Sequence, residues 1–529
     1  MPTATQPHPS YWSTTAPSLR QCPLTHDTRA DVCIVGTGIA GLSTAYLLAC
    51  AGKSVIVLDD GRIADGQTKQ TTAHLSNAID DRYVEIERLH GTGGARLAAD
   101  SHTTAIETIG DIARREQIDC DYERLDGYLF VPEGQSTDTL EQEWQAAHRA
   151  GLTSVQWLDR LPEPWPARPC LRFPQQGQFH PLRYLAGLAL AITRKGGRIF
   201  TGTHAEQMEG GASARVATTN GPQVACSAIV VATNTPVNDM FAIHTKQAPY
   251  MTYVIGATVP RGWVTKGLYW DTLDPYHYVR LEKLHPQDRR DAGPTGDSGP
   301  TYDVNSEELL IVGGEDHKTG QAFDQEERYQ RLELWARERL PKMGPVLFRW
   351  SGQVMEPIDG LAFIGRNPAD KDNVYIATGD SGMGITHGTI AGLLLTDLIL
   401  GRDNPWAKLY DPARKTLRSA KEFISENLNV ATRYADWITG GEARSLDDIP
   451  ADSGAVLREG LSKVAVFRDG SGVVHKFSAV CPHLGCIVAW NASEKTWDCP
   501  CHGSRYDCSG EVVVGPANRG LERLSEPRP

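Results

Sequence analysis

Two short segments near the end of the chain each combine cysteine with histidine, and they restrict what this part of the chain can fold into. The first reads Cys-Pro-His-Leu-Gly-Cys over residues 481–486, and the second reads Cys-Pro-Cys-His over residues 499–502. A single centre can take one sulfur and one nitrogen ligand from each segment only if two loops face each other. The pattern therefore predicts a small domain that presents two metal-binding loops at one end.

Two cysteines and two histidines are the ligand set of a Rieske [2Fe–2S] centre, in which thiolates bind one iron and neutral imidazoles bind the other. The predicted ligands are Cys481, His483, Cys499 and His502. A structural zinc site uses the same residue types. Zinc does not account for four further residues of this region, Cys486, Cys501, Ser504 and Tyr506. We therefore expect an iron–sulfur cluster.

These segments resemble the high-potential Rieske proteins, such as those of cytochrome bc complexes. In that family, cysteines at the positions of Cys486 and Cys501 form a disulfide that clamps the two loops, and the resemblance implies the same pair here. Hydroxyl groups at the positions of Ser504 and Tyr506 hydrogen-bond a bridging sulfide and a cysteine sulfur, which raises the reduction potential. Residues 515–517, Gly-Pro-Ala, are similar to the family's proline loop over the cluster.

A second pattern, near the start of the chain, is typical of dinucleotide binding. Residues 32–35 are a short apolar run of the kind that forms a buried parallel strand. A Gly-x-Gly-x-x-Gly turn follows, then a predicted helix over residues 42–51 and a predicted strand over residues 53–58 that ends at Asp59. The glycines let the backbone approach a pyrophosphate, and the acid is placed to meet the ribose hydroxyls. The predicted contacts in the turn are Gly36, Gly38, Ile39, Ala40 and Gly41.

The second half of the chain repeats the order of strand, glycine turn and helix over residues 373–400. With residues 229–234 and 357–365, this segment resembles the D-amino-acid oxidase, glycine oxidase and sarcosine oxidase superfamily of flavin enzymes, although Ala362 replaces a family proline. The resemblance covers residues 30–400 and implies FAD, with the late turn closing over the isoalloxazine ring and its helix dipole stabilising the reduced flavin. The residues expected at that turn are Gly379, Gly382, Met383, Gly384 and Thr386.

Residues 66–74 resemble the Thr-Thr-x-His motif of the dimethylglycine and sarcosine dehydrogenases, which corresponds here to Thr71, Thr72 and His74. In those enzymes the histidine is bonded to the flavin 8α-methyl group, and such a bond raises the flavin potential. A histidine that packs against the ring or caps a turn fits the same motif. Covalent and non-covalent FAD therefore both stay open for His74.

Residues 245–320 are expected to form the antiparallel sheet that caps the substrate in this superfamily. A strand in this segment would place Tyr276, Tyr278 and Arg280 on one face. The arginine could clamp a carboxylate and the aromatic rings could surround an amine, but an ordinary half-buried strand fits equally well. His317 follows a further predicted strand and would either face the flavin or lie in a polar turn.

The 529-residue chain is therefore predicted to have four parts. They are an N-terminal extension over residues 1–29, a flavin domain over residues 30–404, a helical linker over residues 405–440 and a cluster domain over residues 441–529. The expected fold class is α/β: a Rossmann-like FAD-binding domain with an antiparallel β cap, followed by a small all-β Rieske domain.

Composition narrows the range of partners. The net charge is −12 and no long basic run occurs, so nucleic acid is not expected. The uncharged stretch over residues 32–52 is long enough to span a bilayer, but the glycine turn explains it better, and no transmembrane segment or signal peptide is expected. Eleven cysteines are too few for a disulfide scaffold of this size, and a cytoplasmic protein with one shielded disulfide is expected.

The two halves together predict an oxidoreductase. A flavin of this superfamily removes two electrons from a C–N bond of an amine or amino acid, whereas a Rieske cluster accepts one electron at a time. We expect electrons to pass from a small-molecule substrate to FAD, then to the cluster and to an external one-electron acceptor. The alternative is a reductase or biosynthetic tailoring enzyme in which an external donor reduces the flavin through the cluster. A Rieske oxygenase is not favoured, because no compact His/His/Asp set for mononuclear iron accompanies the Rieske segments.

Overall fold

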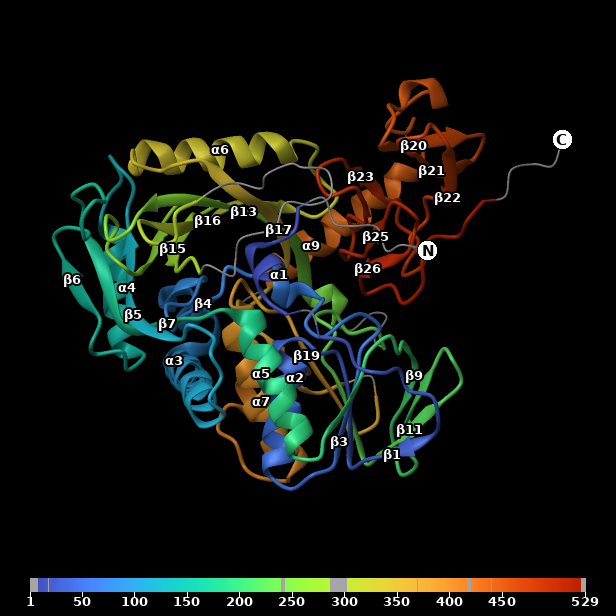
Figure 1. The fold of residues 1–529 in the computed structure, drawn as a ribbon, viewed down its shortest axis with the longest axis horizontal. Helices are drawn as coiled ribbons and strands as arrows, with labels where there is room; N and C mark the ends of the chain where they lie inside the picture. The colour runs from blue at the N-terminus through green and yellow to red at the C-terminus, as the bar shows by residue number, and fades with distance from the viewer. Residues whose placement is uncertain are drawn as a thin grey trace.

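The computed structural model describes residues 8–524, except residue 18 and residues 239–242, 286–301, 369, 416–419 and 439. For residues 420–425, 431, 435 and 438 it describes the backbone alone. The first seven and last five residues, which belong to the predicted N-terminal extension and cluster domain, lie outside the described residues. Figure 1 shows a large body of sheets and helices and, beside it, a smaller body that contains β20 to β26.

A mainly parallel sheet has the strand order β18-β19-β12-β2-β3-β8. Its strands are β2 (Val32–Val35), β3 (Val55–Leu58), β8 (Arg198–Phe200), β12 (Ala228–Val231), β18 (Phe363–Arg366) and β19 (Val374–Thr378). Neighbours are parallel except β18 and β19, which are antiparallel. Every residue of β2, β3 and β12 is buried, as expected for a sheet covered on both faces.

Helices α2 (Ile39–Cys50), α5 (Pro181–Arg194) and α7 (Gly384–Ile399) lie side by side in Figure 1. Helices α2 and α7 approach closely because two glycines of α7 face α2. A Cβ atom at Gly388 would lie 2.5 Å from Ile39 Cγ2, and one at Gly392 would lie 2.7 Å from Ser43 Cβ. This packing brings the starts of both helices, and hence both glycine turns, to one end of the sheet.

A smaller sheet has the order β1-β11-β10-β9 and lies beside β3 in Figure 1. Its strands are β1 (Thr28–Arg29), β9 (Ala205–Glu209), β10 (Arg215–Thr218) and β11 (Gln223–Ala225). Apolar side chains of this sheet, among them Val216 and Val224, pack with Ile56 and Ile229 of the main sheet in one buried cluster. Strands β9 to β11 lie in sequence between β8 and β12, so most of this sheet is an insertion between two strands of the dinucleotide-binding sheet.

The cap is a large twisted sheet in the order β17-β13-β16-β15-β14-β5-β7-β4, with β6 paired to β7. Its strands are β4 (His74–Leu75), β5 (Glu123–Phe130), β6 (Gln156–Leu158), β7 (Cys170–Gln178), β13 (Gln247–Pro260), β14 (Leu268–Asp271), β15 (Tyr278–Glu282), β16 (Glu307–Lys318) and β17 (Val346–Pro357). The antiparallel cap expected over residues 245–320 is confirmed for its described part. The sheet is larger than expected because β4 to β7 and β17 join it, and β14 pairs with β5 in parallel.

Three further helices cover the cap. They are α3 (Arg82–Arg115), α4 (Asp138–Arg149) and α6 (Gln325–Arg339). Helix α3 is bent at Gly91, whose φ of 74° is not helical and is accessible to glycine. Helix α6 lies across β13 and β16 in Figure 1 and buries Tyr329, Leu332 and Trp335 against them.

The C-terminal body consists of two small antiparallel sheets, β20-β21-β22 and β23-β24-β25-β26. Their strands are β20 (Ser453–Glu459), β21 (Ser462–Arg468), β22 (Val474–Ser478), β23 (Ala489–Asn491), β24 (Thr496–Asp498), β25 (Arg505–Asp507) and β26 (Val512–Val514). The two Cys/His segments are the loops between β22 and β23 and between β24 and β25. An all-β domain with facing loops is therefore confirmed.

Between the two bodies the chain forms α8 (Ala407–Tyr410), α9 (Ala420–Arg433) and the 3₁₀ turns η5 (Tyr434–Ile438) and η6 (Leu446–Asp448). Lys318 of β16 forms an ion pair with Glu426 of α9 at 2.6 Å, with both side chains about one-quarter exposed. Helix α9 therefore braces the cluster domain against the cap sheet.

The N-terminal segment packs against the flavin-binding region. Helix α1 (Tyr11–Thr15) buries both Tyr11 and Trp12 completely. The Trp12 indole Nε1 donates to Thr71 O at 2.6 Å, and Ser10 Oγ donates to Lys69 O at 2.6 Å. Lys69 belongs to the 3₁₀ turn η1 (Gln67–Gln70), and Thr71 directly follows this turn. Helix α1 therefore fixes the segment that leads to His74.

A search of the described residues for a helix both long enough and apolar enough to cross a membrane finds none.

Candidate functional site

A cavity of about 1190 Å³ opens at the carboxyl ends of the parallel strands. Its lining includes the residues that end or follow four of these strands: Val35, Leu58, Ala232 and Thr378. Cofactors of open α/β sheets bind outside the carboxyl ends of the strands. The cap sheet and the C-terminal β-domain supply the other walls, so one cavity is bounded by both bodies of the protein.

The early glycine turn has no room for side chains. Gly36 has a φ of 109°, and a Cβ atom there would lie 2.4 Å from Ala232 O. Asp59 Oδ2 accepts hydrogen bonds from Thr37 N at 2.8 Å and Thr37 Oγ1 at 2.6 Å, while Oδ1 accepts from Gly61 N at 2.8 Å. Burial raises the pKa of Asp59. The turn and the acid therefore form one hydrogen-bonded cradle at the start of α2.

The late glycine turn connects β19 to α7. Gly379 and Gly382 have φ values of 72° and 68°, and a Cβ atom at Gly379 would lie 2.8 Å from Pro357 Cγ. The residue before α7, Met383, makes no side-chain cap bond to the first amide groups of this helix. The cavity lining includes these predicted cofactor contacts: Gly36, Gly38, Ile39, Ala40, Asp59, Thr71, Thr72, His74, Gly382, Met383 and Gly384. Gly41, Gly379 and Thr386 lie next to the lining and shape the two turns.

His74 lies in β4 at the edge of this cavity. Its Nδ1 is hydrogen-bonded to Thr72 Oγ1 at 3.0 Å and its Nε2 to Val279 O at 3.4 Å. Burial, reinforced by the charge of Arg280, lowers the pKa of His74 to about 3. The ring is therefore neutral, and both of its nitrogens are engaged within the protein.

The part of the cavity beneath the cap combines aromatic rings with carboxyl groups. The aromatic residues are Trp270, Tyr276 and Tyr278, and the acids are Asp80, Asp316, Glu356 and Asp380. Burial raises the pKa of Asp80 and of Asp380 to about 6 and that of Asp316 to about 7, and it raises the pKa of Glu356 well above the ordinary range. The basic residues of the cavity lining, Lys69, Lys495, Arg505 and Arg523, belong to η1 and to the C-terminal domain and not to the cap. The site is thus suited to a cation with an apolar body.

Two residues expected to meet the substrate do not line the cavity. Arg280 is fully buried, forms an ion pair with Glu282 and donates to Ala73 O at 3.0 Å. Its guanidinium lies 5.3 Å from the centre of the Trp12 ring. Alternation along β15 does place it on the same face as Tyr278, but α1 and the segment before β4 cover that position, which the strand pattern could not show.

His317 lies in β16 with its ring stacked on Tyr253 at 5.7 Å. Burial lowers the pKa of His317 to about 4. The neighbouring Lys318 points to Glu426 of α9. The side chains of His317 and Lys318 therefore serve the packing of the cap against the linker, and neither lines the flavin cavity.

The four predicted cluster ligands come together at the tip of the C-terminal domain. Cys481 and Cys499 are buried, and the rings of His483 and His502 are 5.0 Å apart and perpendicular. Within the described residues, Nδ1 of each histidine is buried and has no hydrogen-bond partner. Buried imidazole nitrogens without partners fit a metal centre, because unsatisfied polar atoms are otherwise costly.

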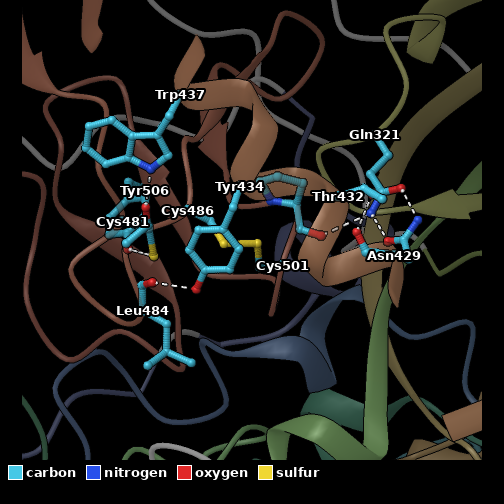
Figure 2. The surroundings of a disulfide bond; sticks show 12 residues. Gln321, Asn429, Thr432, Tyr434, Trp437, Cys481, Leu484, Cys486, Cys501 and Tyr506 are labelled. Carbon is cyan, nitrogen blue, oxygen red and sulfur yellow. Dashed lines mark hydrogen bonds between the residues drawn. A yellow bond between two sulfur atoms is a disulfide. The ribbon is translucent and has the colours of Figure 1, made fainter. Parts of the chain in front are cut away.

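The disulfide implied by the resemblance is confirmed. Cys486 and Cys501 are bonded and join the two loops (Figure 2). Tyr506 Oη is hydrogen-bonded to Cys481 Sγ at 3.1 Å, and Ser504 Oγ accepts from Ala517 N at 3.0 Å in the proline loop. Both hydroxyl groups are fully buried beside the predicted cluster.

Linker residues also hold the first loop. Figure 2 shows Tyr434 and Trp437 of η5 directed at this loop. Tyr434 Oη donates to Leu484 O at 2.8 Å, and Trp437 Nε1 donates to Gly485 O at 3.0 Å. The loop is thereby fixed on the side of the linker as well as through the disulfide.

Contacts between the two bodies were not apparent from the sequence. His244 in η2 (His244–Lys246) lies with its ring 4.9 Å from that of His483 and 6.0 Å from that of His502. Gln353 of β17 donates from Nε2 to Gly503 O at 2.9 Å. Neither residue belongs to a recognisable motif, since each acquires its place from the docking of two domains.

Two family models match the chain. One, described as FAD dependent oxidoreductase, matches residues 31–398, and the other, described as Rieske [2Fe-2S] domain, matches residues 439–525. The chain belongs to the FAD-dependent oxidoreductase family. It is 31% identical over 516 residues to the "Putative Rieske 2Fe-2S iron-sulfur protein YhfW" of Bacillus subtilis (strain 168), covering 97% of each chain.

Two further relatives cover separate parts of this oxidoreductase. Gamma-glutamylputrescine oxidoreductase of Escherichia coli (strain K12) is 28% identical over 388 residues, which is 72% of this chain and 85% of that protein. Cytochrome b6-f complex iron-sulfur subunit 1 of Nostoc sp. is 61% identical over 103 residues, 20% of this chain and 52% of the subunit. The fold resembles that of glycine oxidase from Geobacillus kaustophilus, with a TM-score of 0.57 and 18% identity over 74% of this chain and all of that one.

The oxidoreductase therefore combines an FAD domain with a Rieske [2Fe–2S] domain, as expected for fold, family and cofactors. The residues present fit both groups. A Cβ atom at Gly36 would collide with Ala232, so only glycine lets the early turn lie this close to the sheet and present its backbone to the cavity that would hold the pyrophosphate. The unpartnered nitrogens of His483 and His502 fit the nitrogen-bound iron of the cluster.

Proposed function

We propose that this protein oxidises a C–N bond of an amine at FAD and transfers the electrons singly to the Rieske cluster and then to an external acceptor. The observation that carries the proposal is the shared cavity: residues of the dinucleotide turn and of the Rieske domain, including Arg505 and Ala517, line the same space. When bound, FAD supplies hydride acceptance and the cluster supplies one-electron acceptance. We also propose the domain limits given above, with the linker over residues 405–440.

In this proposal the early turn and Asp59 hold the pyrophosphate and ribose, and the start of α7 faces the pyrimidine edge of the flavin. The cluster ligands are Cys481, His483, Cys499 and His502. Tyr506 donates to Cys481 Sγ, and the Ser504 hydroxyl, which accepts from Ala517 N, keeps its proton for a cluster sulfur. FAD is bound non-covalently, because both nitrogens of His74 are occupied by Thr72 and Val279.

The substrate in this proposal is a cationic amine. Trp270, Tyr276 and Tyr278 surround an alkylammonium group, and the carboxyl groups beneath the cap attract its charge. The relation to gamma-glutamylputrescine oxidoreductase, which is named for an amine substrate, supports this class. A substrate carboxylate fits this proposal less well, because Arg280, the expected cationic partner for it, already forms an ion pair with Glu282.

Asp316 is the proposed proton acceptor. An ammonium group must lose a proton before hydride leaves the neighbouring carbon, since the neutral amine carries the lone pair that assists this step. Oδ1 of Asp316 is buried in the cavity wall without a hydrogen-bond partner among the described residues. With its pKa raised by burial to about 7, this carboxyl group can take the proton at neutral pH.

The proposal is tested by anaerobic mixing with a panel of polyamines, secondary amines and amino acids. Bleaching of the flavin followed by the electron paramagnetic resonance signal of the reduced cluster is the expected result, with polyamines faster than amino acids. An absence of bleaching with every compound would remove amine oxidation. Bleaching without cluster reduction would remove the electron transfer, and cluster reduction by a ferredoxin ahead of the flavin would favour the reverse direction.

A further inference from the structure

The second cluster loop contacts the flavin domain through one cavity-lining side chain. Gln353 of β17 lines the cavity and is only 2% exposed. Its Nε2 donates to Gly503 O at 2.9 Å, and Gly503 directly follows the predicted ligand His502. One side chain therefore reaches from the flavin cavity to the backbone of a cluster-binding loop.

Gln353 is held firmly in this position. Its Nε2 also donates to Thr319 Oγ1 at 3.2 Å, and its backbone N donates to Gln67 Oε1 at 2.8 Å. Gln67 itself lines the cavity in η1. The side-chain amide is thus oriented by Thr319, which follows β16, while the backbone of Gln353 is held by the flavin-binding segment.

The approach of the loop to Gln353 is as close as a backbone allows. Gly503 has a φ of 77°, and a Cβ atom there would lie 2.5 Å from Gln353 Nε2 and 2.5 Å from Pro249 Cβ. Any larger residue at this position would separate the loop from the cap. The glycine therefore sets the separation between the cavity wall and the cluster loop.

The other end of the amide, its carbonyl oxygen, takes no part in these bonds. Gln353 Oε1 is buried and accepts no hydrogen bond from the described residues. The side-chain amide of Gln353 is therefore anchored through its donor group, on Gly503 and Thr319.

We propose that Gln353 is a positioning residue that fixes the Gly503–His502 loop against the flavin cavity and thereby sets the rate of electron exchange between the two cofactors. This inference depends on the function proposed above. In total, two electrons and one proton leave the reduced flavin. Each electron converts one ferric iron of the cluster to ferrous iron, and an external one-electron acceptor reoxidises the cluster between the two transfers.

The chain provides a matched control in Gln321. Its Nε2 donates to Pro500 O at 3.0 Å, in the same cluster loop, and to Asn429 Oδ1 at 2.9 Å (Figure 2). Gln321 does not belong to the lining of the flavin cavity. Replacing it removes a similar bond to the same loop without altering the cavity wall.

The test compares wild type, Gln353→Met and Gln321→Met as holoproteins under laser-flash photoreduction with 5-deazariboflavin, which needs no substrate. Flavin absorbance and cluster circular dichroism report electron exchange between the cofactors. We expect Gln353→Met to slow the exchange by roughly tenfold or more, because small losses of positioning have large kinetic effects. Gln321→Met should stay within about twofold of wild type, and redox titration should give unchanged potentials for both cofactors in each variant.

Equal rates in Gln353→Met and wild type would overturn the proposal. So would equal slowing in the two variants, or a change in potential large enough to explain the slower rate. If Gln353→Met does not incorporate its cluster, Thr319→Val removes one anchor of the same amide and should slow exchange in the same direction. A wild-type protein without any exchange would overturn the proposed function itself, which distinguishes that failure from failure of the Gln353 role.

Discussion

Tyr276 donates a hydrogen bond from its phenol to Asp80 Oδ2 at 2.6 Å, and both residues line the cavity beneath the cap. The pair joins the cap to the segment that follows β4. Burial raises the pKa of Asp80 to about 6, and the bond from Tyr276 opposes this rise by stabilising the carboxylate. The phenol of Tyr276 therefore helps to keep the buried carboxylate of Asp80 charged at neutral pH.

Tyr276→Phe is expected to raise the pKa of Asp80 further. A hydrogen bond to a charged group contributes about 1.5–3 kcal/mol, so the acidic limb of the pH profile for flavin reduction should move upward by about one to two pH units. The profile is measured by anaerobic stopped-flow reduction with an active amine. Tyr278→Phe is the control, because its hydroxyl pairs with Thr252, and an equal shift in both variants would contradict the role of Tyr276.

Asp316→Asn is expected to stabilise the protein while slowing the reaction. Burial raises the pKa of Asp316 from 3.8 to about 7, so the folded state disfavours the charged form. As pH rises from about 4 to about 7, the unfolded chain ionises first and the wild type loses stability. The free energy of unfolding of Asp316→Asn should therefore exceed that of the wild type by an amount that grows over this pH window, by on the order of 2–4 kcal/mol.

The two effects of Asp316→Asn are separable by measurement. Thermal unfolding at several pH values reports the stability difference, and flavin reduction at neutral pH should slow by about a hundredfold or more if Asp316 accepts the substrate proton. Stabilisation without slower reduction would leave Asp316 as a buried acid with no part in the chemistry.

The glycine turns and the Cys/His loops were predictable because each depends on a short run of sequence. The apolar run before Gly36 indicates a buried strand, and the segments that contain Cys481 and Cys499 indicate two facing ligand loops. Neither inference depends on the rest of the chain. Arg280 was misplaced because α1, far away in sequence, covers it with Trp12. Gln353 could not be recognised, since its role arises only when the Rieske domain docks on β17.

The disulfide should contribute substantially to retention of the cluster. Cys486 and Cys501 are separated by 15 residues in sequence, and closing a loop of this length stabilises by about 3 kcal/mol. The double variant Cys486→Ser/Cys501→Ser should lose its visible cluster absorbance at lower temperature than wild type. Cys508→Ser, which alters a free thiol of the same domain, is the control and should leave the transition unchanged.

Release of the flavin tests the assignment of His74. Because Thr72 and Val279 occupy its two ring nitrogens, FAD should appear entirely in the supernatant after denaturation and precipitation. His74→Ala should retain FAD with weaker binding, measured by equilibrium titration of the apoprotein. Flavin that remains with the precipitated wild-type chain, and is lost from it in His74→Ala, would establish a covalent bond and contradict the expectation.

Tyr506→Phe should lower the reduction potential of the cluster. The hydroxyl lies 3.1 Å from Cys481 Sγ, and a donor at that sulfur stabilises the more electron-rich reduced state. A net hydrogen bond of about 0.5–1.5 kcal/mol corresponds to roughly 20–60 mV for one electron. Tyr434→Phe is the matched control, because its hydroxyl donates to Leu484 O in the same loop and not to sulfur. Redox titration followed by electron paramagnetic resonance should show the decrease in Tyr506→Phe alone, and equal potentials in both variants would show that the phenol of Tyr506 does not donate to the cluster.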